Sequence, residues 1–305
     1  MQLMLLMSMA LLFSSCSKQV YLFTSFHEPA TEGLRYLYSY DGYSWKDAGK
    51  IFLKPETGVQ KVMRDPSIAQ GPDGVYHLVW TSSWRGDKGF GYASSKDLIH
   101  WSDQKIINVM QHEPETVNVW APEVLYDQQS KQFIIIWASA IPNRFPKGTE
   151  EDNNNQRMYY TCTKDFVTFT ETKLFMDPGF SVIDAVIVPR KADDYVLVLK
   201  DNTRANRNLK VAFSKTALGP YIGVSAPFSG GLTEGPSVVK IGDQWLIYYD
   251  AYGEKRYAAY RTADFHSFTD VSDQISIPQG HKHGTIFKSS AKVLKGLIAE
   301  AQGSK

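Results

Sequence analysis

Five short apolar segments of the sequence each begin with a carboxylate or an imidazole side chain, usually beside a Pro or a Gly. These residues are Asp65, Glu123, Asp184, Glu234 and His283. An apolar run bounded by such breakers is typical of a buried strand that presents its first residue at one end. Carboxyl and imidazole groups that face one site can act together as acids and bases. The pattern therefore predicts one shared site built from five strands.

A second motif alternates with the first and sets the period of the chain. It consists of a hydroxyl residue, a spacer, an Asp, a small or apolar residue, two spacers and an aromatic residue. Intact copies are centred on Asp41, Asp97, Asp165 and Asp264, and residues 214–221 form a degenerate copy. The copies define units of about 50 to 70 residues, which is the size of a four-stranded propeller blade. Because Asp favours turns, we interpret these four aspartates as structural.

Each unit divides into four strands separated by turns. In the unit that begins at Asp65, the first strand covers residues 65–69 and is followed by a Gly-Pro-Asp-Gly turn. The second strand covers residues 75–80 and the third covers residues 90–94. The fourth begins after Trp101. The later units repeat this order.

The two ends of the chain are out of phase with the repeat. Residues 20–23 and 34–38 are second and third strands with no first strand before them, whereas residues 284–287 are a first strand with nothing after it. The ring therefore closes by pairing its two ends. We predict an all-β fold, a five-bladed β-propeller of four-stranded antiparallel blades. It occupies residues 20–292 as a single domain, and residues 293–305 form a frayed tail.

The propeller topology predicts which side chains meet. The first strand of each blade lies innermost, so the five acidic or imidazole residues surround one axial funnel. The loop after each second strand returns to the same face and adds aromatic, Arg and Asn side chains. Aromatic faces stack on sugar rings, and polar groups match their hydroxyls, so the funnel suits a carbohydrate. The residues predicted to bind it are Trp84, Trp120, Glu123, Arg85, Asp201, Arg204, Tyr252 and Phe26.

The first thirteen residues are almost wholly apolar, and Ser-Ser-Cys follows them. Such a run is short for a membrane span, which needs about 20 residues, but it fits a secretory signal. A cysteine at this point resembles a bacterial lipoprotein box, in which Cys16 would be lipidated. The n-region has no Lys or Arg, and Phe13 stands where Leu is usual. An ordinary signal peptide is the alternative. We predict an exported protein, held on a bacterial membrane through residues 1–16.

The composition excludes several other classes of partner. The formal net charge is +1 with both signs spread along the chain and no basic tract, so no nucleic acid partner is expected. After processing, Cys162 is the one cysteine left, so no intramolecular disulfide can form. We expect a monomer that requires no cofactor.

The motifs together resemble glycoside hydrolase family 43. The resemblance rests on Arg64-Asp65-Pro66, Trp120-Ala121-Pro122-Glu123, Ile183-Asp184, Glu234-Gly235-Pro236 and His283-Gly284, in this order and spacing. That family consists of five-bladed propellers, chiefly arabinofuranosidases, β-xylosidases and arabinanases. The resemblance implies that Asp65 is the general base, Glu234 the general acid, and Asp184 the group that orients the acid and tunes its pKa. It places His283 beside a calcium ion or a water cluster near the axis.

Two features depart from the family pattern. Ala185 replaces a proline that some members have after the third carboxylate, and Glu123 is an additional axial acid. We interpret Glu123 as a supporting group, for instance a partner of Arg64 or a binder of hydroxyls.

These observations predict an exo-acting α-L-arabinofuranosidase that cleaves pentose glycosides of plant polysaccharides. A β-xylosidase or a galactan-cleaving enzyme is the alternative within the family, and a non-catalytic glycan-binding propeller is the alternative from another class. Asp65 and Glu234 come from blades that are not neighbours. A wide gap between two carboxyl groups predicts an inverting mechanism.

Overall fold

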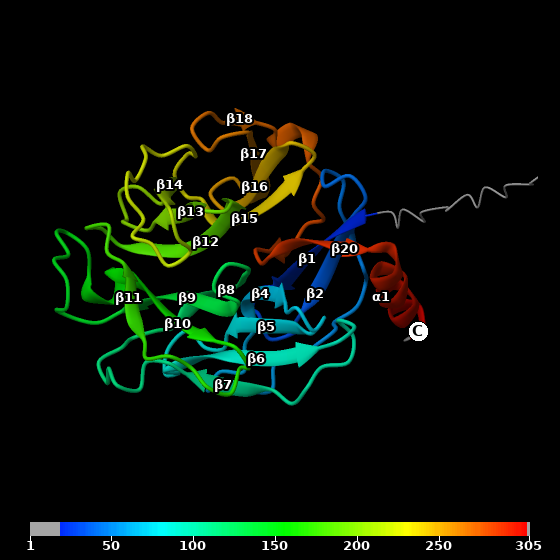
Figure 1. The fold of residues 1–305 in the computed structure, drawn as a ribbon, viewed down its shortest axis with the longest axis horizontal. Helices are drawn as coiled ribbons and strands as arrows, with labels where there is room; N and C mark the ends of the chain where they lie inside the picture. The colour runs from blue at the N-terminus through cyan, green and yellow to red at the C-terminus, as the bar shows by residue number, and fades with distance from the viewer. Residues whose placement is uncertain (1–18, 304–305) are drawn as a thin grey trace, which may run out of the picture.

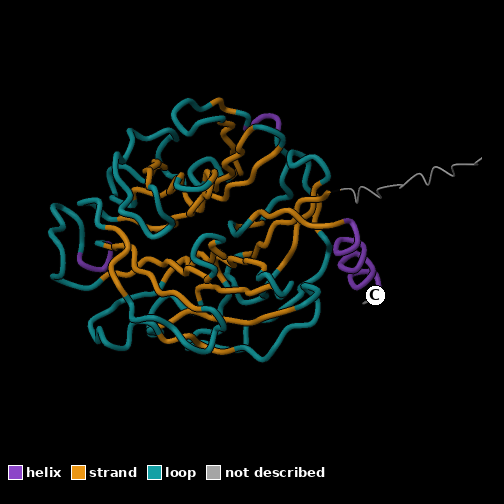
Figure 2. Tube along the Cα trace, in the orientation of Figure 1, coloured by secondary structure: helices purple, strands orange, loops and turns teal. Residues whose placement is uncertain are grey.

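The computed structural model describes residues 19–303, which form five antiparallel sheets arranged in a ring. The colour sequence in Figure 1 passes from one sheet to the next around the molecule, so each blade except the first comes from one continuous segment. Strands make up most of the regular structure (Figure 2). The described residues also contain one α-helix and two short 3-10 helices, η1 (Asp152–Asn154) and η2 (Ser272–Gln274). The predicted all-β, five-bladed propeller is confirmed.

Blades two, three and five contain four strands each, ordered from the axis outward. Blade two contains β4 (Arg64–Gln70), β5 (Tyr76–Thr81), β6 (Gly89–Ser95) and β7 (Lys105–Asn108). Blade three contains β8 (Trp120–Asp127), β9 (Gln132–Ala140), β10 (Gln156–Thr163) and β11 (Lys173–Met176). Blade five contains β15 (Glu234–Ile241), β16 (Gln244–Ala251), β17 (Arg256–Thr262) and β18 (Thr269–Asp270).

Blade four has three strands, followed by a short remnant of a fourth. The strands are β12 (Val182–Lys191), β13 (Asp194–Asp201) and β14 (Asn208–Ser214). An isolated bridge between Phe213 and Ile222 stands where the fourth strand would pair. This is the unit with the degenerate turn motif, and its Pro220 has no N–H to donate to a ladder.

Blade one closes the ring with strands from both ends of the chain. It contains β20 (Ile286–Ser290), β1 (Gln19–His27), β2 (Arg35–Ser39) and β3 (Lys46–Asp47), and the short β19 (His281–Lys282) also pairs with β1. Phe23 lies opposite Ile286, and Gln19 lies opposite Ser290. Figure 1 shows the red β20 beside the blue β1. The predicted pairing of the two ends is confirmed.

The hydrophobic core consists of clusters that lie between neighbouring blades. One cluster joins blades one and two through side chains such as Leu22 and Trp80, and another joins blades two and three around Trp137. Each blade therefore packs its two faces against apolar side chains of its two neighbours, which holds the blades in place around the axis.

The tail differs from the prediction. Residues Ala291–Gly303 form a helix, α1, in which Leu294 and Leu297 are buried against blades one and two. Val293, Leu294, Leu297 and Ile298 share one helical face, which gives the segment an apolar stripe. The prediction of a frayed tail was wrong because this 3.6-residue periodicity was overlooked.

The outer aspartates confirm their structural interpretation. In each copy one carboxylate oxygen accepts hydrogen bonds from the backbone N–H groups two and three residues ahead; Asp97 Oδ1 does so from Ile99 at 2.9 Å and His100 at 2.8 Å. The residue after each Asp has a positive φ, namely Gly42, Leu98, Phe166 and Phe265. The last three of these side chains are buried, so the turn directs an apolar residue into the core.

The innermost strands of blades two to five share an irregularity at the mouth of the axis. Their pairing shifts register between Arg64 and Ser67, Trp120 and Glu123, Ile183 and Val186, and Glu234 and Ser237. The second residue of each bulge has a positive φ, namely Asp65, Ala121, Asp184 and Gly235. A bulge bends its strand and re-aims the side chains beside it. This local geometry decides which motif residues reach the site.

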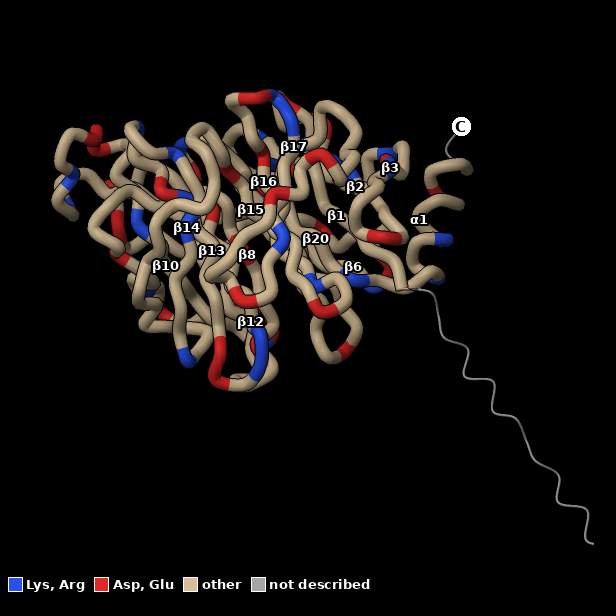
Figure 3. Tube along the Cα trace, turned by 90° about the horizontal axis from the view of Figure 1, so that it is seen from above, with Lys and Arg blue, Asp and Glu red and all other residues tan. Residues whose placement is uncertain are grey.

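The surface carries both signs of charge, scattered over the body of the molecule (Figure 3). Within residues 19–303 no helix is long and apolar enough to cross a membrane. The predicted signal segment and Cys16 lie outside the described residues.

Candidate active site

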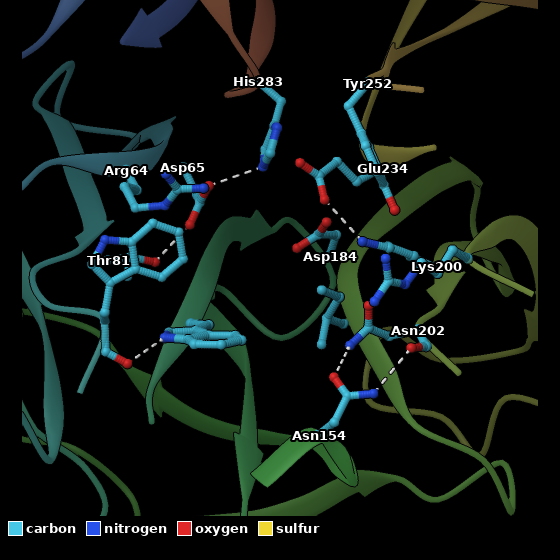
Figure 4. A pocket seen from close by; sticks show the side chains of 14 residues that line it. Arg64, Asp65, Thr81, Asn154, Asp184, Lys200, Asn202, Glu234, Tyr252 and His283 are labelled. Atoms are coloured by element: carbon cyan, nitrogen blue, oxygen red, sulfur yellow. Dashed lines mark hydrogen bonds and ion pairs between the residues drawn. The ribbon is translucent and has the colours of Figure 1, made fainter. Parts of the chain in front are cut away.

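One end of the propeller axis opens into a pocket of about 290 Å³. The first residues of the innermost strands form its floor, and loops that follow the second strands form its wall. Its lining residues are Arg64, Asp65, Thr81, Trp84, Trp120, Asn154, Ile183, Asp184, Lys200, Asn202, Arg207, Glu234, Tyr252 and His283. Figure 4 shows Asp65 and Glu234 on opposite sides of this pocket, with Asp184 close to Glu234 and Lys200.

Asp65 sits at the bulge of β4 and is held by two polar partners. His283 Nε2 lies 2.9 Å from Asp65 Oδ1, and the Thr81 hydroxyl donates to Oδ2 at 2.7 Å. Burial opposes ionisation, but His283, Arg64 and Thr81 together lower the pKa of Asp65 to about 2. Burial likewise opposes the charge on His283, yet Asp65 raises the pKa of His283 to about 9. Asp65 is therefore an ionised carboxylate paired with an imidazolium.

Close packing fixes the position of His283. A Cβ atom at Gly235 would lie 2.0 Å from His283 Cγ, and Gly235 has a φ of +57°, so only glycine fits there. The His283 ring also packs edge-on against Phe26, with 6.1 Å between centroids. Phe26 was predicted to bind the sugar, but it is fully buried and instead supports the imidazole.

Glu234 is paired with a buried lysine. Lys200 Nζ lies 2.9 Å from Glu234 Oε2, its side chain is 3% exposed, and its ammonium lies over the Tyr252 ring. Burial would raise the pKa of Glu234, but the charges of Lys200 and His283 and the hydrogen bond from Lys200 lower it. Glu234 is therefore ionised more readily than an ordinary glutamic acid.

Asp184 has the opposite tendency. Its Oδ2 accepts a hydrogen bond from Gly235 N at 3.0 Å. Burial raises the pKa of Asp184, and the neighbouring carboxylates of Glu234 and Asp65 raise it further, against the charges of Lys200 and His283. The pKa values of the two neighbouring carboxyl groups are thus shifted in opposite directions, and Asp184 is the one that keeps its proton more readily.

Glu123 lies deeper on the axis than the other acids. It lines a small cavity of about 30 Å³, below the pocket, which has room for about one water molecule. Burial raises the pKa of Glu123 to about 7, against hydrogen bonds with the Ser67 and Thr285 hydroxyls. Its interpretation as a partner of Arg64 was wrong, because Arg64 forms an ion pair with Glu28. Its contacts with two hydroxyl groups agree with a supporting role in the protein.

Two tryptophans, both predicted to bind the sugar, form the wall on the Asp65 side. Trp84 and Trp120 meet edge to face with 5.9 Å between ring centroids, and Trp120 Nε1 donates to Trp84 O at 3.0 Å. The Arg64 guanidinium lies 3.9 Å from the Trp84 ring centroid. Trp84 is 42% exposed and can offer apolar surface to a ligand.

Five of the eight predicted sugar-binding residues do not line the pocket, namely Phe26, Glu123, Arg85, Asp201 and Arg204. Arg85 is exposed outside the lining. Asp201 is 1% exposed and pairs with Lys210, and Arg204 forms an ion pair with Glu151. Side chains alternate along a strand, so Lys200 and Asn202 face the pocket while Asp201 faces the opposite way.

Sequence reasoning missed several lining residues. Among them are Lys200, Asn154 and Arg207. Applying strand alternation to the end of β13 would have identified Lys200 and Asn202. Asn154 comes from a long loop in blade three and bonds to Asn202, with Asn202 Nδ2 donating to Asn154 Oδ1 at 3.0 Å. No sequence pattern indicated that contact.

The site fits a calcium ion poorly. In the described part of the chain, one group of potential ligands comes together, formed by Glu234, Asp250 and His283. Calcium takes six to eight oxygen ligands. Here only two carboxylates are present, and Lys200 and Lys282 already pair with them. The expected axial calcium therefore stays a prediction that these residues do not favour.

The fold and the pocket together define a class of protein. A five-bladed propeller with carboxyl groups across an axial pocket has the parts that glycoside hydrolysis requires. Residues 17–292 match the family described as "probable glycosyl hydrolase domain", which is related to glycoside hydrolase family 43. The chain belongs to this family.

Individual proteins and solved structures are also similar to this chain. An α-L-arabinofuranosidase of Bifidobacterium longum subsp. longum is 28% identical over 154 residues, which is 44% of this chain and 14% of that protein. A thermostable family-43 glycoside hydrolase is similar in structure with a TM-score of 0.53 and 16% identity, over 69% of this chain and 72% of that one. A Hadza microbial sialidase, Hz136, has a TM-score of 0.55 and 16% identity, over 80% of this chain and 55% of that one. This chain spans only part of these proteins, and the structural similarity concerns the fold alone.

Proposed function

We propose that the protein hydrolyses glycosidic bonds with inversion, using Asp65 as the general base and Glu234 as the general acid. The observation that carries this proposal is the placement of the two residues across one pocket, each beside its own cationic partner (Figure 4). A gap of about 6.5–9.5 Å between two such carboxyl groups leaves room for the attacking water, whereas a retaining pair lies about 5–5.5 Å apart.

The proposed reaction is a single displacement. Asp65 accepts a proton from a water molecule, whose oxygen bonds to the anomeric carbon while the bond to the leaving oxygen breaks. Asp184 passes its proton to Glu234, and Glu234 passes it on to the leaving oxygen, so both carboxyl groups are ionised after the step. Lys200 stabilises the carboxylate of Glu234. In this mechanism Asp184 holds the proton that Glu234 delivers, and His283 keeps Asp65 ionised.

The favoured substrate is a terminal α-L-arabinofuranosyl unit. The name of the Bifidobacterium relative supports this choice, and the pocket is at the lower end of the usual range for small ligands, which favours exo action. A screen with aryl α-L-arabinofuranoside, β-xyloside and β-galactoside tests it. We expect the arabinofuranoside to be cleaved fastest and Asp65→Asn to lower the activity by about 10²-fold or more. Faster xyloside or galactoside cleavage would identify the alternative substrates, and binding of glycans with no cleavage of any substrate would indicate a non-catalytic propeller.

We also propose that the protein is exported and lipid-anchored through Cys16, and that it acts as a monomer. The apolar segment before Ser14-Ser15-Cys16 supports the first part. Several acyl chains anchor a protein stably, whereas one anchors it only marginally. Cys16→Ala is expected to move the protein from the membrane fraction to the soluble fraction. Unchanged fractionation would contradict the anchor and leave the enzymatic proposal untouched.

A further inference from the structure

The pocket contains a positive charge that the protein itself does not neutralise. Among its cations, Arg64 pairs with Glu28, Lys200 with Glu234, and His283 with Asp65. Arg207 also lines the pocket, but within residues 19–303 its guanidinium forms no ion pair, hydrogen bond or ring contact. A guanidinium in this position is available to a ligand.

Hydrogen bonds of the surrounding loop hold the backbone of Arg207 at the edge of the pocket. The Asp201 carboxylate accepts hydrogen bonds from Thr203 N at 3.0 Å and from Asn206 Nδ2 at 3.0 Å, which closes the turn between β13 and β14. Arg207 N then donates to Thr203 O at 3.1 Å. Arg207 has a φ of +46°, a conformation that costs energy for any residue with a Cβ atom. A strained residue at the edge of a pocket is commonly a functional one.

The same backbone places Arg207 beside the proposed acid. Arg207 O accepts a hydrogen bond from Thr233 N at 3.0 Å, and Thr233 directly precedes Glu234. The side of the bond that Glu234 protonates is the leaving-group side. A ligand group that contacts Arg207 therefore belongs to the sugar that departs.

We propose that Arg207 binds an anionic group on the leaving-group sugar, so that the substrate is an acidic glycan from which a terminal sugar is removed. This inference rests on the proposed function, because it uses Glu234 to define the leaving-group side. The planar guanidinium fork matches the geometry of a carboxylate, as in a uronic acid, and also binds the oxygens of a sulfate ester. Asn202, which lines the same wall, offers further polar contacts.

Direct binding tests this proposal without relying on catalysis. Tryptophan fluorescence from Trp84 and Trp120, or saturation-transfer NMR, would compare methyl glucuronide and methyl galacturonide with methyl glucoside and methyl galactoside. Galactose 6-sulfate forms a second arm and is compared with galactose. We expect the acidic sugars to bind about tenfold or more tightly than their neutral counterparts, with the preference weakening as salt rises. Stronger binding in the first arm identifies a uronic acid as the source of the anion, and stronger binding in the second identifies a sulfated sugar.

Variants assign the effect to one residue. Arg207→Gln is expected to abolish the preference for acidic sugars, and Arg207→Lys to retain part of it, because an ammonium keeps the charge without the fork. Arg204→Gln is the matched control, since Arg204 lies three residues earlier, pairs with Glu151 and lies outside the pocket lining. Equal binding of acidic and neutral sugars, no binding of any acidic sugar, or a preference that survives Arg207→Gln would overturn the proposal. An enzyme that cleaves the aryl glycosides of the screen but shows no acidic preference would retain the proposed function and lose this inference.

Discussion

The molecule has two series of carboxylates, and they differ in the groups that donate hydrogen bonds to them or neutralise their charge. The outer series of Asp41, Asp97, Asp165 and Asp264 is nearly identical from blade to blade, and each member accepts hydrogen bonds from the backbone of its own turn. The inner series differs from blade to blade. Asp65 faces an imidazolium, Glu234 faces an ammonium, and Asp184 lies close to Glu234 (Figure 4). The carboxylates that are alike from blade to blade stabilise the turns of the blades. The carboxylates that differ from blade to blade are the ones that can act as acids and bases.

The largest expected effect comes from the inner series. Asp65→Asn removes the group that activates water, so kcat/KM should fall by about 10²–10⁴-fold. The midpoint of thermal unfolding should also fall, because the variant leaves the buried imidazole of His283 without its counter-charge. Steady-state kinetics and calorimetry on the same preparation check both parts. Asp97→Asn, the matched change in the outer series, should leave kcat/KM unchanged; loss of activity there would erase the distinction between the two series.

The variant Glu234→Gln tests whether Glu234 is the general acid. A natural leaving sugar needs a proton as its bond breaks, whereas a phenol with a low pKa needs little. The variant should therefore lose about 10²–10⁴-fold in kcat/KM on oligosaccharides and much less on an aryl glycoside with an acidic phenol. Kinetics on the two substrates in parallel give the ratio. Equal losses on both would show that Glu234 is not the acid.

Truncating an outer aspartate should affect stability without affecting chemistry. Asp97→Ala deletes the acceptor for the Ile99 and His100 N–H groups. The turn then has to keep Leu98 at a positive φ without these two hydrogen bonds. By analogy with the loss of a helix cap, the free energy of unfolding should fall by about 1 kcal/mol. Urea unfolding measures this change. A fall in kcat/KM larger than the loss of folded protein would contradict a purely structural role.

Glu123 provides an effect on stability alone, and this effect depends on pH. Burial raises its pKa from 4.5 to about 7, so the folded protein holds a proton that the unfolded chain releases at lower pH. Its contribution to stability is fully present below about pH 4.5 and is lost as the pH rises through about 7. Glu123→Gln cannot titrate, so its stability relative to the parent should rise by about 1–3 kcal/mol between about pH 4 and pH 8. Urea unfolding across this range would show two parallel curves if the prediction is wrong.

Much of the architecture could be predicted from the repeats. The turn motif gave the blade period, and the unpaired strands at the two ends gave the closure of the ring. The tail could not be placed by the repeat because α1 belongs to no blade. Its amphipathic spacing is a separate signal, carried by Leu294 and Leu297.

The strands that contribute to the site could be predicted from the sequence. The side chains of those strands that reach the site were harder to predict. Asp65 and Glu234 were expected in corresponding positions of their strands. The bulges show that Asp65 corresponds to Asp184, whereas Glu234 stands one residue earlier and Glu123 two residues later. A shift of one residue in a strand exchanges the two faces, and a bulge is not visible in apolar periodicity. Lys200 and Arg207 were missed for the same kind of reason, since their positions depend on local register.

The stereochemistry of the reaction tests the central claim most directly. If Asp65 and Glu234 act across the pocket on a water molecule and a leaving oxygen, the first sugar released carries the inverted anomeric configuration. Proton NMR during the first turnovers, before mutarotation mixes the anomers, would show this product, and added methanol would yield no methyl glycoside. The retained anomer appearing first, or a covalent sugar adduct on Asp65 or Asp184, would contradict the single-displacement mechanism.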